Sequence, residues 1–185
     1  TVEGLIQAKG GEPAFPCNIC VNRVAAHYTP TLNDRSVVED GFLLKIDMGV
    51  HVKGFLVDTA TTISFNPEYD NMVMAAENVL SEAVKVVRRG VRAGDVGRVI
   101  SSSSSRWGYQ TIRNLSGHMV EPYRVHAGFS IPNTWVSGSQ ELKAGQIYAI
   151  EPFLTYSEGA GLVVEGDIRN IYSLIKRRKT GDRRL

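Results

Sequence analysis

The stretch FLLKIDMGVHVKGFLVDTATTISF, residues 42–65, decides the fold. Two apolar arms flank a polar tip at residues 51–54, which is the pattern of a β-hairpin. Asp47 and Asp58 interrupt the two arms, one on each side of the tip. Hairpin arms lie side by side, and side chains of matching parity fall on one face of the sheet. We therefore predict that the two carboxylates lie next to each other on one face.

Two more polar residues stand in apolar surroundings, His118 in NLSGHMV and Glu151 in IYAIEPF. Taken singly, such residues have ordinary explanations: a turn cap, an ion pair with arginine, or a satisfied core histidine. A buried ionised carboxylate is nevertheless costly unless it is paired or binds a metal. Three carboxylates and one imidazole suit a divalent ion such as Mn, Fe, Co or Zn. The set predicts a hydrolase that activates water at a metal site, with Gly117 allowing a sharp turn behind His118.

Composition is that of an ordinary globular domain, with 185 residues, 43% hydrophobic and 22% charged. We expect a single domain over residues 1–185 and no transmembrane helix, since no run of 18 apolar residues occurs. The formal charge is only +2, and basic residues collect at 176–184. That tail could contact nucleic acid, but a solvated polar segment is the favoured interpretation.

Periodicity predicts helices at residues 2–8, from about 70 to 90, and from 93 through 100. The five serines at 101–105 predict a weak helix end or a polar surface. Strands are expected within 17–28, 111–118, 125–133, 145–154 and 161–177. The predicted order along the chain is strands, then two helices, then strands again. This order favours an α+β fold with an antiparallel sheet and flanking helices over a βαβ repeat.

Cys17 and Cys20 form a CNIC motif. A redox pair would need a helix that begins at the first cysteine, where a strand is expected here. A zinc site would need a second such pair, which the sequence lacks. We therefore predict a structural role for both thiols.

Four longer motifs, PAFPCNICVNRVAAHYTP, KIDMGVHVKGFLVDTA, RNLSGHMVEPYRVHAG and YAIEPF, resemble the type II methionine aminopeptidases of the M24 family, most closely the archaeal members. The resemblance runs through nearly the whole chain in the correct order. It implies the "pita-bread" fold and a cytoplasmic aminopeptidase with two divalent metal ions (Co, Mn, Fe or Zn). Its expected partners are nascent peptides with N-terminal Met and, transiently, the ribosome. No membrane and no specific nucleic acid are expected.

The resemblance also implies roles for individual residues. Asp47, Asp58, His118 and Glu151 occupy the metal-ligand positions, with Glu151 as a further proton carrier. His27 would face the substrate, and His126 would hydrogen-bond the substrate or the tetrahedral intermediate. From the residues alone, both are merely histidines near turns. Phe15 and Val125 match positions that line the methionine side-chain pocket.

One departure from the family pattern is a fifth ligand, a bridging glutamate in a motif like QFEHT, which this sequence lacks. Glu158 and Glu165 stand in the wrong context to replace it. We therefore expect a partial domain without most of the N-terminal helix and without the C-terminal segment with its helical insertion. Such a chain should bind metal weakly and show weak or absent activity.

The sequence is compatible with two rival functions. An Xaa-Pro aminopeptidase or prolidase would share the fold and the metal ligands but not the AAHYTP and RNLSGH motifs. A non-catalytic relative could keep the fold to bind ribosomes or nucleic acid, which the basic tail would suit. Such relatives tend to lose ligands, so the presence of all four favours an enzyme.

Overall fold

Residues 42–65 form the β-hairpin that the sequence predicts, in a computed structural model that describes residues 1–173. Strand β2 (Leu43–Val52) and strand β3 (Phe55–Ser64) are joined by Lys53 and Gly54. Both linking residues have positive φ, 52° and 89°, as in the tight turns that match the twist of paired strands. In the register, Asp47 stands opposite Ala60, and Gly49 stands opposite Asp58. The two aspartates are therefore diagonal neighbours on one face, as expected.

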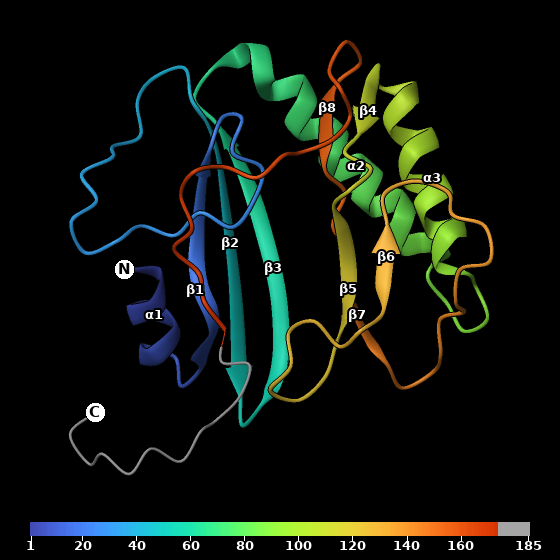
Figure 1. Ribbon diagram of the computed structural model, residues 1–185, viewed down its shortest axis with the longest axis horizontal. Helices are drawn as coiled ribbons and strands as arrows, with labels where there is room; N and C mark the ends of the chain where they lie inside the picture. The colour runs from blue at the N-terminus through green and yellow to red at the C-terminus, as the bar shows by residue number, and fades with distance from the viewer. Residues whose placement is uncertain (174–185) are drawn as a thin grey trace.

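The hairpin belongs to a three-stranded antiparallel sheet in the order β1-β2-β3. Strand β1 (Glu12–Val21) follows helix α1 (Val2–Ala8), which begins where the Thr1 hydroxyl accepts a hydrogen bond from the Gly4 amide. Figure 1 shows the three strands side by side with α1 beside β1. Cys17 and Cys20 are buried in β1 and form no disulfide. Burial raises the pKa of both thiols, which fits the predicted structural role.

The second half of the fold holds five short strands. Strand β5 (Ser116–Val120) lies between β6 (Ser130–Pro132) and β7 (Ile147–Ala149), and β4 (Tyr109–Thr111) pairs with β8 (Leu154–Tyr156). Every pair is antiparallel. The strands are shorter than the sequence predicts, and Glu151 lies just after β7 rather than within a strand.

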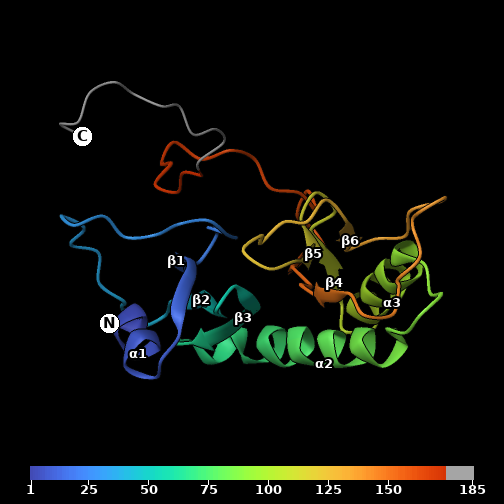
Figure 2. The same cartoon turned by 90° about the horizontal axis from the view of Figure 1, so that it is seen from below.

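Two helices cover one side of these strands, α2 (Asp70–Val86), which follows the short 3-10 helix η1 (Pro67–Tyr69), and α3 (Ala93–Arg106). Figure 2 shows both helices on one side and the segments near 22–42 and 157–173 on the other. The hydrophobic core lies between the helices and β5–β6, and includes Val79, Val96, Ile100, Phe129 and Ile131. No helix within residues 1–173 is both long enough and apolar enough to cross a membrane.

Three expectations about secondary structure are wrong. Helix α3 continues through all five serines, and Ser103 and Ser104 are fully buried rather than on a polar surface. The first strand ends at Val21, because the chain turns at Asn22 with φ 51°. Residues 161–173 form no strand; they run across the first sheet from β8 towards β1 (Figure 1), held by side chains such as Asn170, whose amide donates to the Thr29 carbonyl. The basic tail lies outside the described residues.

Candidate metal centre

Asp58, His118 and Glu151 meet where strand β3 faces strand β5. The His118 Nε2 atom lies 3.2 Å from Asp58 Oδ2 and 3.1 Å from Glu151 Oε1. One ligand atom from each of the three residues lies within 4.8 Å of the other two. Strand β3 of the hairpin, strand β5 and the segment after β7 thus each contribute one side chain to a single cluster.

His118 occupies the middle of its sheet, opposite Ser130 of β6 and Ala149 of β7. The preceding Gly117 is part of the strand, so the predicted sharp turn is wrong. A Cβ at Gly117 would lie 2.2 Å from the Ala149 carbonyl oxygen, so glycine is needed for close approach of two backbones. The His118 Nδ1 atom lies 3.4 Å from the Met119 carbonyl, which leaves Nε2 to face the carboxylates.

Asp47 extends the cluster along the same face of the hairpin. Its Oδ2 accepts a hydrogen bond of 3.0 Å from the Asn18 amide, and its Oδ1 is buried without a partner. Burial, followed by the charge of Asp58, raises the pKa of Asp47 to about 7. Burial and a neighbouring carboxylate both disfavour the ionised form of this side chain.

The charges around His118 have the opposite effect on that residue. Burial alone would lower its pKa, but hydrogen bonds to Asp58 and Glu151 and the charges of both raise it to about 10. One Nε2–H cannot point at both oxygens, so one of the two buried carboxylate oxygens beside Nε2 lacks a well-directed hydrogen bond. Unpaired carboxylate oxygens around one imidazole are the donor set of a divalent-cation site, so these residues fit a metal.

A cavity of about 320 Å³ opens beside the cluster and is lined by Asp47, His118 and Glu151. His27 and His126 also line it. The His126 ring packs edge-on against the His118 ring, with 4.3 Å between centroids. Burial and the charge of His118 lower the pKa of His126. His27 has φ 65°, a backbone conformation that non-glycine residues rarely adopt and that recurs at functional sites.

Phe15 and Val125, predicted to line the methionine pocket, do not line this cavity. Phe15 is nevertheless on the same sheet face: a Cβ at Gly49 would lie 2.3 Å from its ring. The large apolar residues that do line the cavity are Leu115, Phe129 and Phe153. Sequence reasoning missed these three, although Phe153 directly follows the Glu-Pro pair of the YAIEPF motif.

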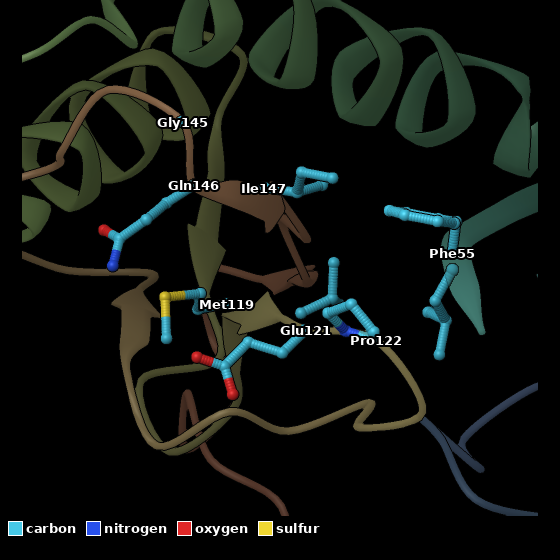
Figure 3. A pocket seen from close by; sticks show the side chains of 9 residues that line it. Phe55, Met119, Glu121, Pro122, Gly145, Gln146 and Ile147 are labelled. Atoms are coloured by element: carbon cyan, nitrogen blue, oxygen red, sulfur yellow. The ribbon is translucent and has the colours of Figure 1, made fainter.

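A second cavity, of about 290 Å³, lies between the start of β3 and the start of β7 (Figure 3). Phe55, Met119 and Ile147 give it an apolar lining, and Glu121 is its one ionisable residue. It contains none of the predicted site residues, so the chemistry belongs to the first cavity.

The sequence identifies the family to which this geometry belongs. Residues 2–170 match the sequence pattern of metallopeptidase family M24. The chain belongs to metallopeptidase family M24. Curated M24 relatives include the methionine aminopeptidases of Methanocaldococcus jannaschii, 42% identical over 96% of this chain, and Thermococcus onnurineus, 47% identical over 89%. The chain spans 60% and 55% of their respective lengths. These relatives confirm the expected resemblance to archaeal methionine aminopeptidases.

Solved structures of M24 proteins share the fold. Methionine aminopeptidase from Thermotoga maritima matches 89% of this chain and 69% of its own length, with a TM-score of 0.79 and 27% identity. Prolidase from Pyrococcus furiosus matches 82% of this chain and 45% of its own length, with a TM-score of 0.70 and 24% identity. The predicted α+β pita-bread fold is therefore confirmed.

Proposed function

We propose that this chain carries the metal centre of a methionine aminopeptidase, which removes the initiator methionine from nascent polypeptides. The observation that carries the proposal is the cluster of Asp47, Asp58, His118 and Glu151 with unpaired buried oxygens beside a cavity. The relatives named above, methionine aminopeptidases at 42% and 47% identity, support the choice of reaction.

The four residues would hold two divalent ions. The carboxylates of Asp47, Asp58 and Glu151 and the imidazole of His118 would supply the ligand atoms. Such a pair of ions polarises a scissile carbonyl and lowers the pKa of the attacking water. The apolar side chains of Leu115, Phe129 and Phe153 border the cavity, and a soft thioether packs well against such surfaces.

The chain's own residues would handle protons and developing charge. Glu151 lines the cavity beside His118 and would take the proton of the attacking water. His126 lies beside His118, and its lowered pKa keeps its imidazole neutral near pH 7. A neutral imidazole can donate one N–H to the oxyanion of the tetrahedral intermediate. His27, at the same cavity, would contact the substrate.

The test compares the purified chain with Asp58→Asn, which keeps the side-chain shape but removes the negative charge of a predicted ligand. We expect slow, Mn- or Co-dependent release of methionine from Met-Ala-Ser, which Asp58→Asn abolishes without changing the circular dichroism spectrum. Asp95→Asn, at an exposed aspartate of α3, is the matched control and should retain the activity. Equal release by the unchanged chain and Asp58→Asn at saturating Mn would contradict the proposal.

An Xaa-Pro peptide assayed beside Met-Ala-Ser separates the proposed activity from a prolidase activity on the same fold. We expect no metal-dependent cleavage of the Xaa-Pro peptide. Preferential cleavage of that peptide would assign the site to the rival reaction. A cytoplasmic location and transient contact with the ribosome are further proposals that follow from action on nascent chains.

A further inference from the structure

We propose that Asn18 is a positioning residue of the metal centre, which fixes the orientation of the Asp47 carboxylate and leaves its Oδ1 available as a metal ligand. The inference rests on the proposed function and adds a residue to it. Asn18 lies on β1 directly opposite Asp47 of β2, and only 2% of its surface is exposed. Its side-chain amide donates to Asp47 Oδ2 at 3.0 Å.

A strand irregularity brings this residue to the site. Phe15 stands opposite Gly49, and continuation of that register would place Cys17 opposite Asp47. The register shifts between Phe15 and Asn18, so the amide occupies that place instead of the thiol. Bulges of this kind re-aim side chains next to active sites.

The chemistry of an amide suits the task of orienting a ligand. A lysine or arginine at this position would neutralise the carboxylate and compete with the metal, whereas an amide donates a hydrogen bond and leaves the negative charge in place. The bond occupies Asp47 Oδ2 and leaves the buried Oδ1 without a partner. Partners that orient metal ligands in this way contribute strongly to metal affinity.

A purely structural role explains Asn18 less well. Its own Oδ1 is buried without a hydrogen bond, so the residue satisfies one neighbour and leaves one of its own atoms unpaired. Buried polar groups are normally satisfied, so an unpartnered buried amide oxygen has no evident benefit for stability. The hydrogen bond that Asn18 does make is directed at a predicted metal ligand, Asp47.

The matched comparison comes from Asn133. This residue is also fully buried, its amide donates to a backbone carbonyl, that of Leu115, and its Oδ1 has no partner. It makes no hydrogen bond to a predicted metal ligand within the described residues. Replacement of Asn133 by leucine therefore reports the general effect of removing a buried amide from this fold.

The experiment measures Mn²⁺ binding to the 185-residue chain by isothermal titration calorimetry, beside thermal unfolding in EDTA. We expect Asn18→Leu to weaken Mn²⁺ binding about 10- to 100-fold, while its metal-free melting temperature falls no further than that of Asn133→Leu, which also loses one buried hydrogen bond. Asn133→Leu should leave Mn²⁺ affinity within about twofold of the unchanged chain, a threshold well below the 10- to 100-fold effect of losing an orienting partner. Asn18→Ala, which adds no bulk, repeats the test in case leucine does not fit.

The contrary results are distinct. Unchanged Mn²⁺ affinity in Asn18→Leu, or an equal loss in Asn133→Leu, would overturn the role of Asn18 and leave the proposed function standing. Loss of the native circular dichroism spectrum in both Asn18 variants would make Asn18 a folding residue and overturn the inference too. Absence of Mn²⁺ binding by the unchanged chain would overturn the metal centre itself.

Discussion

Asp47 and His118 hold their protons more tightly in the folded chain than in water, with pKa values of about 7 and about 10. Burial and the carboxylate of Asp58 raise the pKa of Asp47. Burial alone would lower the pKa of His118, but the carboxylates of Asp58 and Glu151 outweigh this effect and raise it. Both groups must release a proton before they can bind a cation. The protonation of these two residues therefore links pH to metal affinity and to stability.

We predict opposite pH trends for the metal-free and metal-bound chain. A raised folded pKa stabilises the fold below the unfolded pKa, and this stabilisation is lost as pH rises through the folded value. The metal-free melting temperature should thus fall from about pH 4 to pH 10. Mn²⁺ affinity should rise over the same range, with about two protons released per site near pH 6. Isothermal titration calorimetry in buffers of different ionisation enthalpy measures the Mn²⁺ affinity and the number of protons released, and thermal unfolding measures the melting temperature. An Mn²⁺ affinity that does not change with pH would contradict the prediction.

At the residue scale, much of the site could be predicted from the sequence because charges in apolar stretches stand out. Asp47, Asp58, His118 and Glu151 were found in this way, and the structure brings them together. Their role as ligands stays a prediction. Asn18 was missed because its position opposite Asp47 depends on a register shift in β1, which no local pattern reveals.

At the scale of elements, the turn of the β2–β3 hairpin is joined to the β5–β6 loop by Tyr123. Its backbone amide donates to the Gly54 carbonyl at 3.0 Å, and its ring covers Gly54, where a Cβ would lie 2.3 Å away. The ring also packs edge-on against His51, with 5.5 Å between centroids. This contact joins the element that carries Asp58 to the element that carries His118.

We predict that Tyr123→Ala weakens Mn²⁺ binding about 3- to 10-fold, on the order of 1 kcal/mol. Loss of the ring lets the hairpin move relative to β5, which loosens the spacing of Asp58 and His118. Tyr123→Phe keeps the ring and the backbone hydrogen bond, so it should bind like the unchanged chain. Equal titration curves for the alanine and phenylalanine variants would show that the contact does not position the ligands.

Helix α3 supplies a prediction about stability. The Ser104 hydroxyl is fully buried without a partner, whereas the exposed Ser102 donates to the Val99 carbonyl. Alanine raises helix propensity by roughly 0.5 kcal/mol at either position. Ser104→Ala should stabilise the chain by about 1 kcal/mol more than Ser102→Ala, because an unpaired buried hydroxyl is removed. Urea unfolding of both variants measures the change in the free energy of unfolding. A Ser104→Ala variant that is less stable than the unchanged chain would contradict the prediction.

Element boundaries show where sequence patterns fail. The hairpin and α1 were predicted well, because turn chemistry and helix ends are local signals. Residues 161–173 have an apolar, strand-like pattern, yet they pair with no strand; their side chains bond to distant loops instead, as Asn170 does to Thr29. The serine run fills a helix because tertiary burial overrides a mediocre propensity.

At the scale of the whole molecule, the candidate centre joins two separate sheets. No ladder pairs β3 with β5 or β7 within residues 1–173, so Asp58 meets His118 and Glu151 across a boundary between sheets. A bound cation would therefore link the two halves of the fold. At a metal concentration of 100 times the dissociation constant, binding to the native state stabilises a protein by about 2.7 kcal/mol.

The most direct test of the metal centre is anomalous diffraction from crystals of this chain grown with Mn²⁺. We predict an anomalous peak at about 2.0–2.4 Å from the ligand atoms of Asp58, His118 and Glu151, on the cavity side of β3 and β5. The same peak should disappear in crystals of Asp58→Asn grown with the same Mn²⁺. An ordered, empty cluster at millimolar Mn²⁺, or a peak only elsewhere on the molecule, would contradict the account.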